Sequence, residues 1–314
     1  MSDKLKSFLI NAPKPSMKIL IFDVYNLVFK YLFASYYEYK QHKTQYQLGI
    51  ETEKYTEEMM YDYWLHLFVS GFFSNIKRVK PDRVIMAIEG GGKCWRKTLY
   101  PNYKANRKHD DMEIDFQAFK NKMIAFLKVM EKTFTNVYFI SEIDTEADDV
   151  MAVLTKEFSK DLNNEIEIIS TDSDLYQLQI NKNVRQYNTN KKEYSISINP
   201  LLDLEIKVLS GDKSDNITAI FNRCGPKTAQ KVINEGLEKY LEKEEVREIY
   251  ERNLKLIDFK YIPHNFQENI LNKFDNYKIQ KLEPMNVYNF FIKNGLVKLS
   301  DDWQMNYPYI KELS

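Results

Sequence analysis

The stretch MKILIFDV, residues 17–24, decides the fold of this chain. Its short apolar run, rich in residues that favour strands, is typical of a strand buried on both faces of a parallel sheet. Similar runs follow at 83–89 (RVIMAIE), 137–140 (VYFI) and 165–170 (EIEIIS). Amphipathic segments separate these runs, and such alternation predicts an α/β domain with a mainly parallel sheet.

The helical segments extend this prediction along the chain. We expect helices from the first strand to about residue 40, over 59–79, near 115–132, and from residue 145 onward. The pattern becomes mostly helical after about residue 203, which predicts an α/β domain at 17–202 and a helical domain at 203–314. The first 16 residues are polar and lack the apolar core of a signal peptide, so we interpret them as an extension.

Composition limits the class of protein. Lys plus Arg number 45 and Asp plus Glu number 45, so the net charge gives no support of its own to nucleic-acid binding. The two cysteines lie in different segments without metal-ligand spacing, which argues against a zinc site or a disulfide framework and fits a reducing compartment. No apolar run reaches transmembrane length, and we expect a cytoplasmic protein.

Acidic residues stand where the predicted strands end. Asp23, Glu89 and Asp172 lie at or just past the carboxyl ends of three of them, the edge at which parallel sheets bind ligands. With the acidic motifs TEADDV, STDSDL and SGDKSDN, the candidate metal ligands are Asp23, Glu89, Glu146, Asp148, Asp149, Asp172, Asp174, Asp212 and Asp215. Mg²⁺ prefers such oxygen ligands. Carboxylates forced together without cations would repel one another strongly.

Each acidic motif alone also has a structural interpretation. TEADDV fits a helix capping box. Asp172 and Asp174 flank a serine where a turn is expected, and Asp212 and Asp215 could be ordinary turn residues. Asp23 is harder to explain in this way, because a charge at the end of an apolar strand would be partly buried without a partner. The whole set therefore indicates a metal site more strongly than its members do.

The segment at 90–110 combines basic and aromatic side chains. Cations bind phosphates, and aromatic rings can stack on exposed bases. Five side chains recur at helical spacing and would form one stripe: Lys93, Arg96, Lys97, Tyr100 and Lys104. Pro101 is expected to divide the segment into two short helices. A solvated basic helix face is the alternative, but the position directly after Glu89 favours contact with a substrate.

A second basic segment spans residues 213–236. Gly225 and Pro226 precede a helix expected to start near Lys227, and its free N–H groups could hold a phosphate. The surrounding cations are Lys213, Arg223, Lys227 and Lys231. A Gly-Pro turn between helices is also ordinary loop chemistry, so both interpretations stay open.

Taken in order, five motifs over residues 17–234 resemble the flap endonuclease and 5′–3′ exonuclease family. They are ILIFDVYN, AIEGGGKCWRKTLYPNYKANR, TEADDV, STDSDLYQL and SGDKSDNI…GPKTA. The later stretches NLKLIDFKYIP and VYNFFIKNGLVKL resemble the branch of T4-type phage ribonuclease H. The resemblance implies a PIN-like catalytic domain, a helical arch at about 90–110, and a helix–three-turn–helix element at about 207–236.

The same resemblance implies the chemistry. Two Mg²⁺ ions, replaceable by Mn²⁺, would be held with Asp23, Asp148 and Asp172 around one and Asp174 and Asp215, with Asp212, around the other. A metal-activated water would then hydrolyse phosphodiester bonds. The implied substrates are DNA and RNA–DNA duplexes with 5′ ends or flaps, as in RNA primer removal during DNA replication and repair.

The resemblance also assigns roles to the basic residues. Lys93, Arg96 and Lys104 would act on the scissile phosphate, and Tyr103 and Arg107 would meet the threaded strand. Contacts to duplex phosphates would come from Lys213, Lys227, Thr228 and Lys231. A monomer without membrane contact is implied, in the host cytoplasm if phage-encoded, with a single-strand-binding or other replisome protein as a partner.

Two departures and two rival functions accompany this interpretation. Glu89 stands where the family usually has Asp, so it could coordinate differently or through water. The loop TAIFNRC at 218–224 lacks the usual glycines, and we therefore assign no potassium ion. One rival is a phosphatase with Asp23 as nucleophile, but Tyr25 occupies the place of its second acid. The other is a catalytically impaired DNA-binding scaffold of the same fold.

Overall fold

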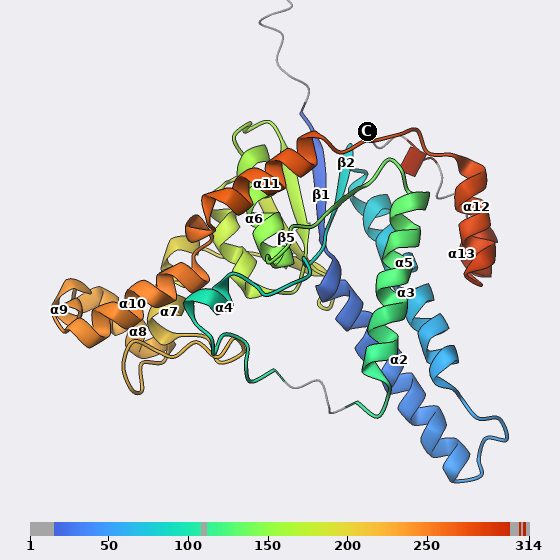
Figure 1. Cartoon of the computed structure of the whole chain (residues 1–314), viewed down its shortest axis with the longest axis horizontal. Coiled ribbons are helices and arrows are strands. Elements are labelled where there is room, and N and C mark those ends of the chain that lie inside the picture. The colour runs from blue at the N-terminus through green and yellow to red at the C-terminus, as the bar shows by residue number, and fades with distance from the viewer. Residues whose placement is uncertain (1–15, 108–111, 302–307, 309, 312–314) are drawn as a thin grey trace, which may run out of the picture.

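The computed structural model describes residues 16–107, 112–301, 308, 310 and 311 (Figure 1). The polar extension therefore lies almost wholly outside the described residues, as does the end of the 90–110 segment. Within the described ranges, none of the helices combines the length and the apolar character that a membrane span requires.

Six strands form one sheet in the order β3-β2-β1-β4-β5-β6. Their bounds are β1 (Lys18–Asp23), β2 (Arg83–Ala87), β3 (Tyr138–Ile140), β4 (Glu165–Ile169), β5 (Val184–Asn188) and β6 (Glu193–Ser195). Neighbouring strands are parallel except β5 and β6, which are antiparallel. The predicted α/β class with a mainly parallel sheet is confirmed. The sequence did not indicate β5 and β6, because VRQYN and EYS are short and largely polar.

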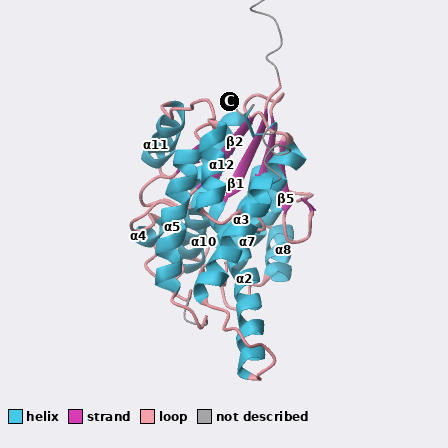
Figure 2. Cartoon of the chain, turned by 90° about the vertical axis from the view of Figure 1, so that its right-hand side faces the viewer, coloured by secondary structure: helices cyan, strands magenta, loops and turns pink. Residues whose placement is uncertain are grey.

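The central strand β1 supplies both halves of the core, since successive side chains of a strand point to opposite faces. Leu20 and Phe22 join the apolar cluster on one face, and Ile19 and Ile21 join the cluster on the other. Helices cover both faces, as Figures 1 and 2 show. The first face carries α2 (Val24–Gln47), α3 (Glu57–Val79) and α5 (Phe116–Thr133); the second carries α6 (Ala147–Phe158).

Helix α2 is longer than the sequence indicated. We expected it to end at about residue 40, but it continues to Gln47 and forms with α3 a hairpin that projects beyond the sheet (Figure 1). The added residues QHKTQYQ are polar, so no apolar periodicity marked them as helical. The hairpin loop ends at Thr56, whose hydroxyl accepts the N–H of Met59 at 3.2 Å and caps α3.

The region after residue 200 is helical, as predicted, but it packs in two places. Helices α7 (Pro200–Ser210), α8 (Pro226–Glu235), α9 (Glu238–Leu241) and α10 (Glu244–Ile257) share a small apolar cluster of their own. After η2 (Phe259–Tyr261), α11 (His264–Asp275) packs on α6 and β3. Helices α12 (Pro284–Lys293) and α13 (Val297–Asp301) then return to the first face, where α12 contacts α5.

The 90–110 segment is less helical than the sequence indicated. Within residues 90–107, the part of this segment that the structure describes, α4 (Arg96–Leu99) is the only helix, and the residues from Pro101 to Asn106 form a series of turns. The prediction of two helices there was wrong, because tertiary contacts hold the backbone outside a helical repeat. The N–H of Trp95 donates to the carbonyl of Asp144 at 2.8 Å, and that of Lys104 donates to the carbonyl of Asp215 at 2.8 Å.

Candidate functional site

A cavity of about 360 Å³ opens at the carboxyl edge of the sheet. Asp23 ends β1, Glu89 follows β2, Asp172 follows β4, and Glu146 and Asp148 lie at the start of α6. The charged side chains in its lining are Asp23, Lys30, Glu89, Lys104, Arg107, Glu146, Asp148 and Asp172. The structure therefore brings together carboxylates that the sequence placed at strand ends, because those strands are parallel and end at one edge.

Three of these carboxylates lie close to one another: Asp23, which is buried, and Asp148 and Asp172, which are half-buried. Asp23 accepts the N–H of Asn26 at 3.0 Å and the hydroxyl of Ser170 at 2.8 Å. Burial, together with repulsion from Asp172, still raises the pKa of Asp23 to about 6. Burial likewise raises the pKa of Asp148 well above its ordinary value, with added repulsion from Asp172 and Asp23. Such a group is most stable with a bound cation, which offsets burial and mutual repulsion together.

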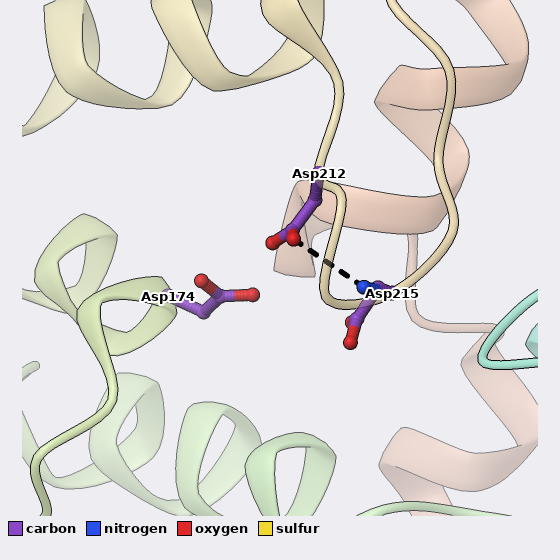
Figure 3. Close-up of side chains that lie close together, drawn as sticks. All are labelled: Asp174, Asp212 and Asp215. Carbon is purple, nitrogen blue, oxygen red and sulfur yellow. Dashed lines mark hydrogen bonds between the residues drawn. The ribbon is translucent and has the colours of Figure 1, made fainter. Parts of the chain in front are cut away.

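A second acidic group lies beside the first. Asp174, Asp212 and Asp215 each offer one carboxylate oxygen, and these oxygens lie within 4.8 Å of one another (Figure 3). The turn that presents two of them is closed by paired backbone hydrogen bonds of 2.9 and 2.7 Å between Asp212 and Ile217. Oxygen ligands at this spacing suit a hard divalent cation, so the donor set fits magnesium or manganese.

Lys207 belongs to this group, although the sequence analysis missed it. Its ammonium contacts Asp174 and lies 2.7 Å from an oxygen of Asp212. Burial acts to raise the pKa of Asp212, but hydrogen bonds from Lys207 and Ser214 lower it to about 2. Lys207 lies in the last turns of α7, five residues before Asp212. A basic residue at this short distance before an acidic motif was a sequence signal that could have identified Lys207 as a candidate.

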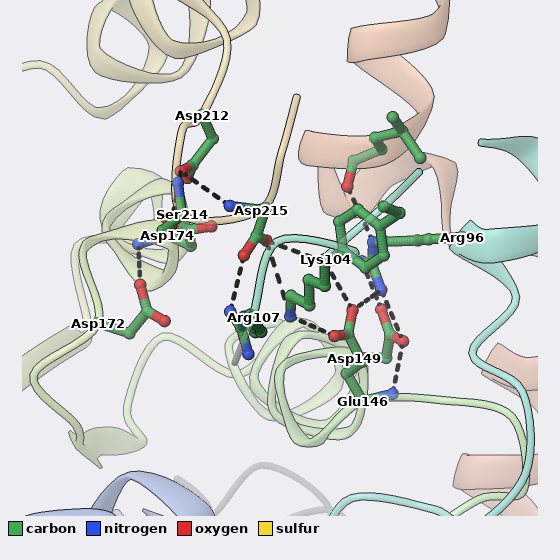
Figure 4. Close-up of polar contacts among 12 residues, drawn as sticks. Arg96, Lys104, Arg107, Glu146, Asp149, Asp172, Asp174, Asp212, Ser214 and Asp215 are labelled. Atoms are coloured by element: carbon green, nitrogen blue, oxygen red, sulfur yellow. Dashed lines mark hydrogen bonds and ion pairs between the residues drawn. The ribbon is translucent and has the colours of Figure 1, made fainter. Parts of the chain in front are cut away.

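Glu146 is held at the start of α6 by three donors (Figure 4). Arg96 Nη1 donates at 2.8 Å, the hydroxyl of Tyr103 donates at 2.9 Å, and the ammonium of Lys104 contacts the other oxygen. Burial would raise the pKa of Glu146, yet Lys104 and Arg96 together lower it to about 2. This carboxylate is therefore ionised and oriented by the 90–107 segment.

Asp149 is fully buried, and protein donors occupy its oxygens. It accepts Trp95 Nε1 at 3.0 Å, Arg96 Nη1 at 3.0 Å and Nη2 at 2.7 Å, and the N–H of Glu146 at 3.0 Å. Together with Glu146 it forms the capping box of α6. Asp149 lines neither the cavity nor the second acidic group, so the structural interpretation of TEADDV holds for this residue.

Arg96 is not on the surface either, since only 3% of its area is exposed. Its Nε donates to the carbonyl of Leu256 at 2.8 Å, and its other nitrogens bind Glu146 and Asp149. The structure therefore does not bring Arg96 onto one solvent-facing stripe with Lys93, and this corrects the expected pattern. Lys93 is exposed and lines a second hollow of about 620 Å³ between the 90–107 segment and α5.

Lys104 and Arg107 connect the two acidic groups. Arg107 Nη2 donates to one oxygen of Asp215 at 2.7 Å. The other oxygen lies 3.0 Å from the hydroxyl of Tyr103, whose single proton is shared between Asp215 and Glu146. Lys104 Nζ contacts Glu146 and lies 3.7 Å from Asp215. Lys104, Arg107 and the exposed Glu89 line both the cavity and the second hollow. The two hollows thus share a boundary that carries both positive and negative charge.

The remaining candidates lie on the loop after α7 and on α8, apart from the cavity. Lys213, Lys227 and Lys231 are exposed, and Thr228 is half-buried. Lys231 pairs with Glu235 at 3.5 Å on the same helix. Gly225 is the N-cap of α8, and the helix begins at Pro226, one residue before the start near Lys227 that the sequence indicated. None of the four residues Lys213, Lys227, Thr228 and Lys231 lines the cavity or belongs to the second acidic group.

Two family models match the chain. The model of the 5′-3′ exonuclease N-terminal resolvase-like domain matches residues 18–201, and that of the T4 RNase H C-terminal domain matches residues 198–305. Among curated proteins, ribonuclease H of Enterobacteria phage T4 is 32% identical over 264 residues, which cover 75% of this chain and 84% of that protein. A 5′-3′ exonuclease of Mycoplasmopsis pulmonis is 31% identical over 179 residues, covering 54% of this chain and 57% of that protein.

Solved structures share the fold. The bacteriophage T5 D15 flap endonuclease, in a complex with DNA and metal ions, has a TM-score of 0.60 at 18% identity and covers 84% of this chain and 100% of its own. T5 5′-exonuclease with bound zinc has a TM-score of 0.58 at 17% identity and covers 83% and 99%. With the two family models and the phage T4 relative, these matches lead to one conclusion. The chain belongs to the 5′–3′ exonuclease family, in which the flap endonucleases are also found, and its C-terminal region matches the family model of the T4 RNase H C-terminal domain.

Proposed function

We propose that this chain is a Mg²⁺-dependent nuclease that cuts DNA and RNA–DNA duplexes near 5′ ends or flaps. Hydrolysis of phosphodiester bonds is the activity of its family. The observation that carries the proposal is the pair of adjacent acidic groups. One lines the cavity, and the other comes from the 211–217 turn and from η1 (Ser173–Ile180). Three cations lie between and beside them: Lys104, Arg107 and Lys207. RNA primer removal in replication and repair fits such an activity.

Two divalent ions would be held by different carboxylates. Asp23, Asp148 and Asp172 fit one ion, because burial raises the pKa of each of them more than nearby Lys104 lowers it. Asp174, Asp212 and Asp215 fit the second, because their oxygens are close enough to share an ion. Bound there, such ions supply Lewis acidity and lower the pKa of a bound water. Mn²⁺ would substitute for Mg²⁺, and we assign no potassium ion.

The surrounding side chains would handle the nucleic acid. Lys104 and Arg107 lie at the mouth of the cavity, where they can meet a phosphate once the carboxylates are neutralised. Phe29 and Phe33 of α2 line the same cavity and offer faces on which bases can stack. Exposed Lys213, Lys227 and Lys231, with half-buried Thr228, would contact duplex phosphates outside the cavity. A single-strand-binding or replisome partner and a monomeric state stay predictions.

The test is cleavage of a 5′-labelled flap DNA and of a matching RNA-primed duplex, each with Mg²⁺ or with EDTA. We expect cutting near the 5′ junction only with the metal, and the ratio of the two rates gives the preference for DNA or RNA. Asp172→Asn should lose activity by several kcal/mol of transition-state stabilisation, on the order of 10³-fold. Exposed Asp275, at the end of α11, gives the matched control Asp275→Asn.

Two results would contradict the proposal. Tight flap binding without cleavage in any divalent metal would favour the impaired scaffold. Near-normal turnover of Asp172→Asn, with the control unchanged, would show that the buried acidic group does not perform the reaction.

A further inference from the structure

The end of helix α10 is joined to the catalytic region by two side chains. The last carbonyls of a helix have no partner within the helix. Here the carbonyl of Leu256 accepts Arg96 Nε at 2.8 Å, and that of Ile257 accepts Gln177 Nε2 at 3.1 Å. The side-chain oxygen of Gln177 also accepts the N–H of Phe259 at 2.9 Å. Leu256 and Ile257 are themselves buried, so these bonds are shielded from water.

Each of the two side chains also holds one of the acidic groups. Arg96 reaches from Leu256 to Glu146 at 2.8 Å and clasps Asp149 with both terminal nitrogens. Gln177 Nε2 donates to the backbone carbonyl of Asp174 at 2.9 Å, in the first turn of η1. Glu146 lines the cavity, whereas Asp174 belongs to the second acidic group. One helix end is therefore linked, through a single side chain each, to a carboxylate of the cavity, Glu146, and to the second acidic group.

Resting on the proposed function, we propose that Arg96 and Gln177 are positioning residues that use the end of α10 as a common anchor for the two metal-binding groups. Arg96 is not available to a substrate phosphate, because each of its nitrogens already donates to the protein. A cation is also well placed at a helix C-terminus, where the helix dipole is negative. Residues that orient metal ligands contribute to affinity for the ion without touching it, typically by 10- to 100-fold.

The variants Arg96→Lys and Gln177→Met test this inference. Lysine keeps the charge but cannot span Leu256, Glu146 and Asp149 together, and methionine keeps the length of glutamine without its hydrogen bonds. Two matched controls make equivalent contacts away from α10. Arg78→Lys changes an arginine bound to buried Glu167, and Gln179→Met changes an amide of η1 that bridges the Ser195 carbonyl and the Ser197 N–H, both at 3.0 Å.

Mn²⁺ binding to the full chain without nucleic acid is measured by calorimetry, with melting temperatures in EDTA to verify the fold. We expect each test variant to bind Mn²⁺ about 10-fold more weakly or worse, while each control stays within about twofold of the wild type. Flap cleavage by Arg96→Lys should recover towards the wild-type rate as Mg²⁺ is raised. A residue that contacts the phosphate would not be rescued in this way.

Suppose that the wild type binds Mn²⁺ and cuts flap DNA, and that both test variants bind Mn²⁺ within about twofold of it. This result would overturn the positioning role and leave the proposed function standing. A wild type that neither binds Mn²⁺ nor cuts would overturn both. A lower melting temperature with normal Mn²⁺ affinity would assign Arg96 and Gln177 to fold stability alone, against the inference.

Discussion

Replacing Asp23 by asparagine should stabilise the metal-free protein while it removes the activity. Burial raises the pKa of Asp23 from its usual 3.8 to about 6. A tenfold change in an ionisation constant corresponds to about 1.4 kcal/mol. Keeping Asp23 ionised at neutral pH therefore lowers the free energy of unfolding by about 3 kcal/mol. Asparagine is a good helix N-cap but gives up one bond from Ser170, which costs about 1 kcal/mol. The net gain is about 2 kcal/mol.

The pH dependence has a definite sign. The pKa of Asp23 in the folded state lies above its value in the unfolded state. Its unfavourable contribution to the free energy of unfolding is therefore absent below about pH 4, grows between about pH 4 and pH 6, and is complete above about pH 6. In EDTA at pH 7.5, Asp23→Asn should therefore melt about 4 °C above the wild type, at roughly 2 °C per kcal/mol for a chain of this size. This advantage should shrink as the pH is lowered towards 4.

Thermal unfolding followed by circular dichroism measures the effect. Asp115→Asn is the matched control, because Asp115 also caps a helix, accepting the N–H of Ala118 at 2.9 Å, but is exposed. It should show no gain. Saturating Mg²⁺ should raise the melting temperature of the wild type more than that of Asp23→Asn, because binding to the folded state stabilises it. A variant that melts at or below the wild type in EDTA at pH 7.5 would refute the reasoning.

Three further predictions follow from particular contacts. Lys104→Met should reduce cleavage and, in EDTA, lower the free energy of unfolding by about 3 kcal/mol, because buried Glu146 loses one of its two cations and keeps only Arg96. An unchanged free energy of urea unfolding in EDTA would contradict this. Trp64→Ala should cost about 3–5 kcal/mol in urea unfolding by opening a core cavity, with Mn²⁺ affinity retained. Gly211→Ala should weaken Mn²⁺ binding, because the φ angle of Gly211 is +69° and an added Cβ would lie 2.4 Å from the carbonyl oxygen of Ile217. An unchanged Mn²⁺ affinity of the variant would contradict this prediction.

The sequence predicted the parts of the site that depend on local pattern. Asp23 and Asp172 were found because apolar strands are easy to recognise, and parallel strands bring their carboxyl ends to one edge. The acidic motifs after residue 140 were found because they cluster in sequence. Neither inference needed a contact between distant residues.

What the sequence could not supply depends on such contacts. The helical spacing of Arg96 with its neighbours indicated a solvent-facing stripe, but its partner Leu256 is 160 residues away and draws the side chain inward. The sequence predicted Asp149 as a metal ligand, but in the structure its carboxylate oxygens accept hydrogen bonds from Arg96 and Trp95. The spacing of Lys207 before Asp212 was a signal in the sequence, but its contact with Asp174, 33 residues earlier, depends on the tertiary fold.

The return of α12 to the first face of the sheet affects how the chain folds as it is made. Phe290 and Phe291 are almost fully buried, with ring centroids 5.4 Å from Phe134 and 5.8 Å from Phe73 respectively. These rings belong to the same apolar cluster as Leu20 and Phe22 of β1, which are synthesised long before α12. Domains usually fold as units during translation. Here part of the apolar cluster beneath α2, α3 and α5 stays uncovered until synthesis has reached α12.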